Sequence, residues 1–575
     1  MSTRRGVFVF IVLLALLGAA AVFAAFTLRH PSDSVHDASY LVFDVPEDLD
    51  EGEAPPGDYT VDWLRPNRPQ LWKIVLGLRQ AAKDDRIAGL ILHVADLDWG
   101  WAKVQEVRDA VLEFRAQGKP IYASFEGGGE REYLLASAAD VIGVPPLTTM
   151  QLDGLSASAM FFKGTLDKLD IKPNFTHVGA YKSGSESYTR NDMSPEAREA
   201  LQKLVDDLYD GLVDSLASAR EVPRDTMAAL LDDGPYDAPT AYERGLIDTV
   251  LYESELDSLA IQEDDGDRPT ITLNHYLDHT RRPTGPKHIA LVVASGVIDE
   301  GKSRNTAADG EVLGSETMAK VMEEIHDRHS VKAVVLRVDS PGGSAEASDE
   351  IWNEVERVHA EKPVVVSMSD YAASGGYYVS SAASTIVADP TTITGSIGVY
   401  GGKLNVIGLY HKLGLNVETV SRGQHAEMLS PFKDFTPDEA RRFDASMQYV
   451  YDTFVQRVAD GREMEAKDVE RVAQGHVWSG LAASKRGLVD ELGGLERSIE
   501  VAKQLANIPA SEAVTIDVYP KSERNFLRRF IGELFADESD DETLQRIPGL
   551  RAMVEAAQFP SGKPLTLLPY HIDIR

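Results

Sequence analysis

The fold class is indicated most clearly by residues 333–344, Ala333-Val334-Val335-Leu336-Arg337-Val338-Asp339-Ser340-Pro341-Gly342-Gly343-Ser344. Its first half is a run of aliphatic residues that predicts a buried strand, and its second half is a tight turn. Further strands are expected at 289–293 and 363–367, and amphipathic helices at 316–329 and 345–360. Strands separated by helices imply crossover connections and a mainly parallel sheet, so this part of the chain is predicted to be an α/β domain.

The same plan occurs twice along the chain. With a shift of about 243 residues, the sequence Arg-Gly-Leu-Ile-Asp at 244–248 matches Arg-Gly-Leu-Val-Asp at 486–490. Internal similarity at a fixed spacing indicates duplicated units. We therefore expect a first α/β repeat at 31–260, a linker rich in turn-forming residues at 261–287 and a second α/β repeat at 288–520. The remaining segment, 521–575, is a C-terminal extension that has no counterpart in the first repeat.

Length and composition exclude several classes of protein. The 575 residues exceed the roughly 250–300 that one hydrophobic core holds, so at least two domains are expected. The 58 basic and 91 acidic residues give a net charge of −33 with no basic stripe, so we expect no nucleic-acid partner. Cysteine is absent, which excludes disulfides and thiolate chemistry. The 14 histidines form no close cluster of metal-ligand type, so no metal and no cofactor are expected.

The N-terminus predicts one membrane crossing within residues 1–30. An uncharged run of about 21 residues extends from Gly6 to Phe26, which as a helix spans roughly 30 Å of hydrocarbon. A cleavable signal peptide is the alternative, but this run exceeds the usual apolar region of about 7–15 residues. Arg4 and Arg5 precede the run, which predicts a cytoplasmic N-terminus and places the rest of the chain on the other side of the membrane.

The two repeats differ in the turn after their second strand. The second repeat has Pro341-Gly342-Gly343, whereas the first has Asp98-Trp99-Gly100-Trp101. Glycines after a strand leave backbone N–H groups unobstructed, which suits an oxyanion site, although an ordinary tight turn has the same composition.

They differ again where a small-residue stretch follows the next strand. The second repeat has Ala372-Ala373-Ser374-Gly375-Gly376, and the first has Glu130 at the position aligned with Ser374. A serine flanked by small residues near a helix N-terminus is how a nucleophilic hydroxyl is presented. The alternative is that the small residues only allow a helix to pack closely.

A third difference concerns a possible general base. The first repeat has Lys182 within Gly179-Ala180-Tyr181-Lys182-Ser183, and the second has His425 at the aligned position. A lysine near its ordinary pKa of about 10.4 would need lowering by roughly 3 units to act as a base at neutral pH. His425 is the alternative base, since a serine paired with histidine is the commoner arrangement.

Together these features resemble the long, tandem-repeat form of bacterial signal peptide peptidase A, also called protease IV. The resemblance implies two tandem copies of a fold related to the Clp protease proteolytic subunit and to crotonases. It implies Ser374 as nucleophile, Lys182 as general base, and Ser396, in Thr394-Gly395-Ser396, as the hydroxyl that orients the lysine. Backbone N–H groups at Gly343 and Gly375 are the implied oxyanion donors.

The resemblance also implies a function and a location. The expected activity is that of a membrane-anchored serine endopeptidase with a Ser/Lys dyad, which degrades cleaved signal peptides and other apolar peptides. The implied location is the bacterial inner (cytoplasmic) membrane, crossed once, with the catalytic domains on the periplasmic side and a homotetramer as the assembly. An inactive peptide-binding scaffold of the same fold is the main alternative; a crotonase-like acyl-thioester enzyme fits less well because no nucleotide site is evident.

Overall fold

The computed structural model describes residues 35–53, 68–262, 267–306, 310–521, 563–568 and 574. The predicted membrane span at 6–26 lies outside these residues. Within the described part of the chain, no helix is long and apolar enough to cross a membrane.

The first repeat is built on a parallel sheet of six strands in the order β8-β4-β3-β2-β1-β9. The strands are β1 (Ser39–Val45), β2 (Ile87–Val94), β3 (Ile121–Phe125), β4 (Val141–Val144), β8 (Thr249–Val250) and β9 (Thr270–Thr272). The helices are α2 (Leu71–Ala82), α3 (Trp101–Ala116), α4 (Glu130–Ala136), α5 (Lys163–Leu169), α6 (Glu186–Thr189), α7 (Pro195–Ala219), α8 (Arg224–Asp232), α9 (Ala238–Glu243), α10 (Glu253–Ile261) and α11 (Leu273–His279). A two-stranded ladder, β5 (Thr149–Met150) with β7 (Tyr236–Asp237), completes the repeat.

The segment expected to be a linker, 261–287, carries more structure than a connection. It contains β9 and α11, and β9 pairs in parallel with β1 at the edge of the first sheet. Residues in this segment therefore extend the first repeat before the chain reaches the second. Three residues of strand between polar stretches gave no periodic signal in the sequence.

The second repeat has the predicted strands and helices. Its main sheet has eight strands, and β18 and β20 form the antiparallel pair in an otherwise parallel arrangement. The strands are β10 (His288–Ser295), β14 (Val331–Ser340), β16 (Val364–Ala373), β17 (Thr385–Ala388), β18 (Ile393–Gly395), β20 (Val477–Ser479), β21 (Glu491–Leu492) and β22 (Thr515–Tyr519). The helices are α12 (Ser315–Asp327), α13 (Ala345–His359), α14 (Gly375–Ser380), α15 (Ile407–Lys412), α16 (Pro437–Gly461), α17 (Ala466–Val472), α18 (Gly480–Ser484) and α19 (Leu495–Leu505).

The repeated sequence features have the same structural role in both halves. In the first repeat the Tyr133 hydroxyl donates to the carbonyl of Leu246 (2.6 Å), and in the second the Tyr377 hydroxyl donates to the carbonyl of Leu488 (2.8 Å). Each bond ties the helix after the third strand to the Arg-Gly-Leu turn. The duplication seen in the sequence is therefore a duplication of packing.

A third sheet joins the two repeats. It has seven strands in the order β12-β13-β11-β15-β23-β19-β6. Strand β6 (Lys172–Val178) comes from the first repeat, the short strand β23 (Leu565–Leu567) comes from the C-terminal extension, and the others belong to the second repeat. The others are β11 (Val297–Asp299), β12 (Arg304–Thr306), β13 (Gly310–Gly314), β15 (Gly342–Ser344) and β19 (Val399–Asn405).

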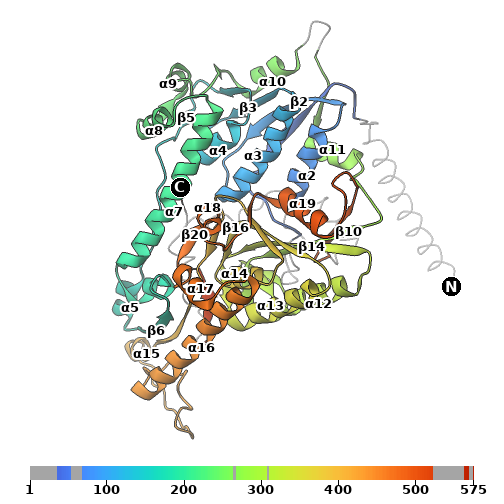
Figure 1. Cartoon of the computed structure of the whole chain (residues 1–575). Helices are drawn as coiled ribbons and strands as arrows, with labels where there is room; N and C mark the ends of the chain where they lie inside the picture. Colours follow the sequence, from blue (N-terminus) through green and yellow to red (C-terminus); the bar gives the residue numbers. More distant parts are fainter. Residues whose placement is uncertain are drawn as a thin grey trace, which may run out of the picture.

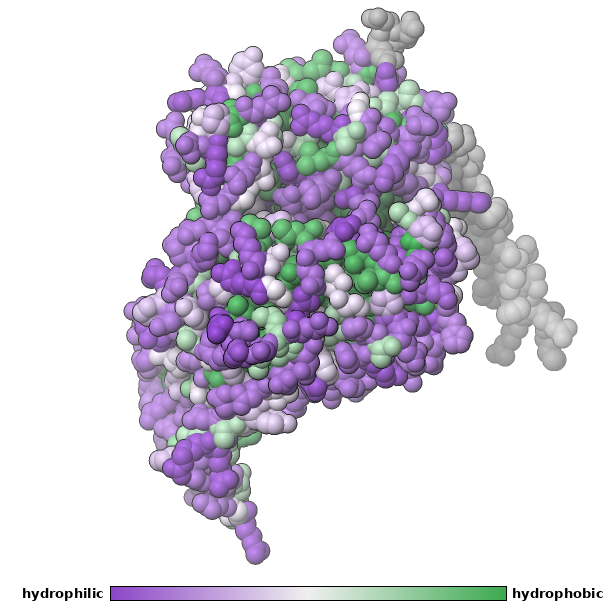
Figure 2. All heavy atoms as spheres, viewed as in Figure 1, coloured by the Kyte–Doolittle hydropathy of each residue, from purple (hydrophilic) through white to green (hydrophobic). Residues whose placement is uncertain are grey.

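The two repeats form two stacked lobes (Figure 1). The long helix α7 runs from the first lobe down toward β6, which lies beside α15 and α16 of the second. On the face shown in Figure 2 the surface is mostly hydrophilic, and apolar residues gather at the level where the lobes meet. The chain of the first repeat thus reaches into the second, and the candidate site forms where it does so.

Candidate active site

Ser374 occupies a strained turn between β16 and α14. Its backbone has φ +54° and ψ −110°, a conformation that costs a residue with a Cβ about 1–3 kcal/mol. The Ser374 N–H donates to the carbonyl of Gly395 (2.8 Å), which holds the turn against β18. The residue is fully buried. A side chain in a strained turn at the end of a strand, next to glycines, is positioned for chemistry more than for packing.

The glycines after Ser374 are required by close contacts. A Cβ on Gly375 would lie 2.6 Å from Ser348 Oγ, and one on Gly376 would lie 2.6 Å from the Ser340 carbonyl oxygen. The small-residue stretch at 372–376 therefore has both of the roles considered for it. The glycines allow α14 to pack against β14 and α13, and the same turn presents the serine.

Lys182 is carried to Ser374 by a strand of the first repeat that pairs with the second. Strand β6 pairs antiparallel with β19 over its whole length, from Lys172 opposite Asn405 to Val178 opposite Val399. Beyond β6, the Tyr181 N–H donates to the carbonyl of Gln474 (2.8 Å). The lysine follows directly, so backbone pairing on both sides of the turn fixes its position.

Among the residues that the structure describes, the hydrogen-bond partners of the Lys182 amine are neutral oxygens. Its Nζ lies 2.7 Å from Ser374 Oγ, 2.9 Å from Ser396 Oγ and 2.9 Å from the Ser396 carbonyl oxygen. The side chain is 0% exposed, and burial lowers the pKa of Lys182 well below its usual value. No carboxylate contributes to this shift. Burial therefore favours the uncharged form of the amine, which can accept a proton.

Two glycines of the second repeat enclose the lysine. Gly475 has φ +76°, and a Cβ there would lie 2.5 Å from the Lys182 backbone nitrogen. A Cβ on Gly398 would lie 3.1 Å from Lys182 Cδ. The close approach of Gly475 and Gly398 contributes to the full burial of Lys182.

The predicted oxyanion donors lie at the end of β14, in β15 and at the start of α14. Gly342 has φ +101°, and its N–H donates to Ser340 Oγ (3.1 Å). This bond orients the loop that carries the next residue, Gly343. A Cβ on Gly342 would lie 2.7 Å from the Gly375 nitrogen, so the two predicted donor segments are adjacent.

The C-terminal strand β23 lies on this edge, which the sequence did not predict. It pairs antiparallel with β15, with Thr566 opposite Gly343. Bonds from Leu568 N to Pro341 O (2.7 Å) and from Ala345 N to Pro564 O (3.3 Å) flank the pair. In an antiparallel ladder hydrogen-bonded pairs alternate, so Gly343 and Thr566 form the hydrogen-bonded pair between these two. The peptide edge beside the predicted oxyanion donors is thus occupied by an extended backbone.

The alternative candidates do not meet Ser374. His425 Nε2 lies 3.3 Å from Asp438 Oδ2, near the start of α16, whereas Lys182 contacts the serine. Glu130, the first-repeat counterpart of Ser374, accepts hydrogen bonds from the N–H groups of Asp153 (2.9 Å) and Gly154 (2.7 Å). Burial raises the pKa of Glu130. The structure therefore brings together Lys182, Ser374 and Ser396 and assigns the other two residues to local contacts.

Comparison with known proteins identifies the family of the chain. Residues 113–264 and 356–509 each match the model of peptidase family S49. The chain belongs to peptidase family S49. The matches fall one in each repeat, which confirms the predicted α/β fold with two repeats, and the chain is a serine peptidase.

Named relatives cover most of the chain. The chloroplastic serine protease SPPA of Arabidopsis thaliana is 37% identical over 446 residues, which span 76% of this chain and 66% of the plant protein. Protease 4 of Haemophilus influenzae is 34% identical over 471 residues, which span 78% of this chain and 75% of the relative. The resemblance inferred from the motifs is confirmed by these relatives.

Among solved structures, a ClpP1 mutant from Listeria monocytogenes aligns with 36% of this S49 chain and 94% of its own. The TM-score is 0.25 and the sequence identity is 13%, a likeness too weak to carry an argument. The predicted relation to the Clp protease subunit and to crotonases therefore stays a prediction.

Proposed function

We propose that this S49 peptidase is a membrane-anchored serine endopeptidase in which Lys182 activates Ser374. The observation that carries the proposal is the 2.7 Å contact between a fully buried amine and a fully buried hydroxyl. The absence of any carboxylate among the causes that shift the lysine pKa supports a neutral base.

The first half of the reaction follows from this contact. Lys182 accepts the Ser374 proton as the oxygen attacks the carbonyl carbon of a peptide bond. The negative charge that develops on the carbonyl oxygen is stabilised by the N–H groups of Gly343 and Gly375. Ser396 contacts the same amine and holds it in line with the serine.

The second half returns the proton. The ammonium of Lys182 protonates the leaving amine, which departs and leaves an ester on Ser374. Water then attacks the ester carbonyl while the neutral lysine accepts a proton from it. The C–O bond to Ser374 breaks, the acid product leaves, and the lysine ammonium returns the proton to the Ser374 oxygen. The lysine ends in the neutral form in which it began.

The substrate class follows from the strand beside β15. A peptide that pairs with β15 as β23 does would place one carbonyl beside the Gly343 and Gly375 N–H groups. In β23 the residue at that point is Thr566, which is fully buried, and its neighbour Leu565 is buried as well. Extended apolar segments with a small residue at the central position fit this arrangement. Cleaved signal peptides are substrates of this kind, and a substrate must take the place of β23.

The location and assembly belong to the same proposal. The uncharged run at 6–26 supports a single membrane anchor, and the arginines before it support a bacterial inner-membrane protein whose catalytic repeats face the periplasm. A homotetramer is proposed from the family resemblance. Carbonate extraction of membranes and protease protection of intact spheroplasts test the anchor and its orientation, and light scattering of the detergent-solubilised chain tests the tetramer.

The test of the activity is turnover of an internally quenched apolar peptide by wild type, Ser374→Ala and Lys182→Ala. We expect hydrolysis by the wild type and its loss in both variants, with unfolding transitions retained. His425→Ala is the control and should keep activity, because its side chain pairs with Asp438. Equal turnover in all four proteins would contradict the dyad.

The occupied edge of β15 favours one second candidate, a peptide-binding scaffold without catalysis. The two candidates differ when the edge is freed. Deleting residues 563–575 should raise kcat/KM for the quenched peptide if the chain is a peptidase. For a scaffold, the deletion would raise peptide affinity while turnover stays absent.

A further inference from the structure

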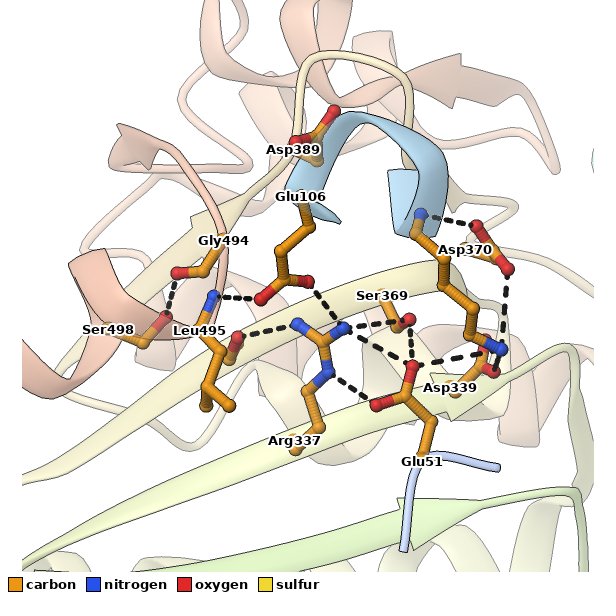
Figure 3. A network of polar contacts seen from close by, with 12 residues as sticks. Glu51, Glu106, Arg337, Asp339, Ser369, Asp370, Asp389, Gly494, Leu495 and Ser498 are labelled. Atoms are coloured by element: carbon orange, nitrogen blue, oxygen red, sulfur yellow. Dashed lines mark hydrogen bonds and ion pairs between the residues drawn. The ribbon is translucent and has the colours of Figure 1, made fainter. Parts of the chain in front are cut away.

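A buried cluster of charged side chains joins the two repeats (Figure 3). Its members from the first repeat are Glu51, Lys103 and Glu106, and those from the second are Arg337, Asp339 and Asp370. Its second-repeat members lie on β14 and β16. Strand β14 leads into residues 341–343, which carry a predicted oxyanion donor and are called the oxyanion loop below, and β16 leads into Ser374. Nothing in the mechanism above uses these groups.

Asp370 lies four residues before Ser374 and binds the start of a helix of the other repeat. Its Oδ2 accepts the N–H of Gly100 (3.0 Å) and its Oδ1 accepts the N–H of Lys103 (3.1 Å). Helix α3 has no cap from its own neighbouring side chains, so this carboxylate satisfies the free N–H groups at its N-terminus. The strand that carries the nucleophile is thereby fixed to the first repeat.

Asp339, near the end of β14, connects this strand to β16. The pairing of β14 with β16 is interrupted between Val338 and Ser340, where the register shifts. At this interruption Asp339 Oδ1 accepts the N–H of Tyr371 (3.1 Å), so a side chain replaces the missing backbone bond. The two strands are therefore joined by a carboxylate just before the catalytic loops begin.

Lys103 connects the two carboxylates. Its Nζ lies 2.6 Å from Asp339 Oδ2 and 3.3 Å from Asp370 Oδ2. Although burial favours the neutral amine, the attraction of the two aspartates raises the pKa of Lys103 well above its usual value. One ammonium from the first repeat thus bridges the ends of both catalytic strands.

Arg337, the other cation of this cluster, is already engaged and does not replace Lys103. Its guanidinium contacts Glu51 at 2.8 Å and Glu106 at 2.7 Å, and Figure 3 shows these carboxylates on either side of it. Without Lys103, Asp339 and Asp370 would remain buried side by side with no cation between them. A buried carboxylate that loses its partner is strongly destabilised and moves or takes up a proton.

We propose that Lys103 is a positioning residue: by bridging Asp339 and Asp370 it sets the spacing between the Gly343 N–H and the Ser374 hydroxyl. The inference rests on the proposed peptidase activity. Its consequence is that the first repeat supplies, besides the base, the contact that aligns the oxyanion loop with the nucleophile. Misplacement of a catalytic group by about 1 Å costs roughly 100-fold in rate.

The test compares Lys103→Met with Lys103→Arg, and with Lys83→Met as matched control. Lys83 is an exposed lysine of the same repeat that pairs with Glu113 on the surface. For each protein, kcat and KM are measured with the quenched apolar peptide, together with the inhibition constant of a peptide boronate that forms a tetrahedral adduct with the serine.

We expect Lys103→Met to lower kcat by roughly 10- to 100-fold with KM changed less than about threefold. Boronate affinity should fall in parallel with kcat, because it reports the alignment of the oxyanion donors. Lys103→Arg should restore much of the loss, and Lys83→Met should match the wild type.

A double variant covers the case in which Lys103→Met does not fold. Lys103→Met with Asp339→Asn removes one charge of each sign, and the Asn oxygen can still accept the Tyr371 N–H. It should fold and should show the same loss in kcat and in boronate affinity. A core truncation in the first repeat, Leu78→Ala, serves as a control for lost stability and should leave kcat per folded molecule unchanged.

Two outcomes separate this inference from the proposed function. An active wild type together with unaltered kcat and boronate affinity in the folded Lys103 variants would overturn the positioning role alone. A folded wild type that neither turns over peptide nor binds the boronate would overturn the proposed function, and this inference with it. A loss of kcat in Leu78→Ala equal to that in Lys103→Met would also overturn the positioning role.

Discussion

The two repeats differ in how they use a glycine N–H in the turn after their second strand. In the first repeat Gly100 donates to the carboxylate of Asp370. In the second, Gly343 lies in the corresponding turn and faces a strand at the sheet edge, where a substrate carbonyl could lie. In the first repeat the glycine N–H therefore binds a carboxylate side chain, whereas in the second it faces a paired strand whose place a substrate could take.

Glu130 and Ser374, at aligned positions of the two repeats, also have different roles. Glu130 uses its buried carboxylate to bind two backbone N–H groups, and the counterpart residue, Ser374, offers a hydroxyl to Lys182. Both copies keep the tyrosine that ties a helix to the Arg-Gly-Leu turn, because each copy must stabilise its own core. Chemistry needs only one functional site, so it can be lost from one copy without loss of the fold.

Removal of the Ser374 hydroxyl should have the largest effect on activity. Ser374→Ala should lower kcat by roughly 10⁴- to 10⁶-fold, because the attacking oxygen is removed. Glu130→Gln, the change at the corresponding point of the first repeat, should leave kcat within about twofold. Steady-state kinetics with the quenched peptide measure both, and a similar loss in the two variants would show that the repeats share the chemistry.

The second effect concerns the residue that the first repeat contributes. Lys182→Met should lower kcat by roughly 10²- to 10⁴-fold, since the general base is lost. The same variant should unfold at a higher temperature than the wild type at neutral pH, because the wild type must deprotonate this lysine on folding.

The pH dependence of that stability gain has a definite sign. Burial lowers the folded pKa of Lys182, so between that pKa and the unfolded value of about 10.4 the unfolded chain binds more protons. Stability of the wild type therefore rises with pH, and the advantage of Lys182→Met should shrink as pH approaches 10.4. Thermal unfolding followed by circular dichroism from pH 6 to pH 10 measures it; an advantage that grows with pH would contradict a buried neutral amine.

A third, smaller effect tests the oxyanion loop. Gly342→Ala adds a Cβ at φ +101°, where it would lie 2.0 Å from the Thr566 carbonyl oxygen and 2.7 Å from the Gly375 nitrogen. It would therefore disturb both the strand edge and the predicted donors, and kcat should fall by roughly 100-fold. Gly118→Ala is the matched control, because Gly118 has φ +74° with open space around it and lies in the first repeat. Boronate affinity should fall in the first variant and not in the second; equal affinities would remove the loop from the site.

Asp248 and Asp490 make equivalent structural contacts in the two repeats, and their substitution should have the smallest effect. Asp248 accepts the Ile142 N–H (2.9 Å) and pairs with an arginine, and Asp490 does the same with the Ile386 N–H (2.7 Å). Asp248→Asn and Asp490→Asn should each cost about 0.5–1.5 kcal/mol in the free energy of unfolding, with kcat unchanged. Urea denaturation gives both values, and a loss confined to one repeat would contradict equivalent packing.

Much of the fold was predictable because its signals are local. Aliphatic runs such as the one at 333–338 form strands buried on both faces, and the amphipathic run at 345–360 forms α13. The meeting of Lys182 with Ser374 was predictable only by combining the duplication with the family resemblance. Neither residue alone has a signal that differs from an ordinary surface lysine or a small residue in a helix.

The remaining features depend on pairing between distant parts of the chain. Strand β23 has three residues, too few for a periodic pattern, and its position is set by the free edge of β15. Lys103 in α3 has the spacing of a surface lysine, and its burial arises only when the second repeat supplies Asp339 and Asp370. Long-range pairing of this kind has no counterpart in local composition.

The role of Lys182 as the base that activates Ser374 can be tested by the pH dependence of the rate at which a fluorophosphonate labels Ser374. If the buried amine of Lys182 removes the serine proton, the rate should rise with pH through a single pKa well below 10.4 and then level off. In Lys182→Met the rate should be far lower and this pH dependence should vanish. The same rise in the variant, at the same pH and rate, would mean that another group activates the serine.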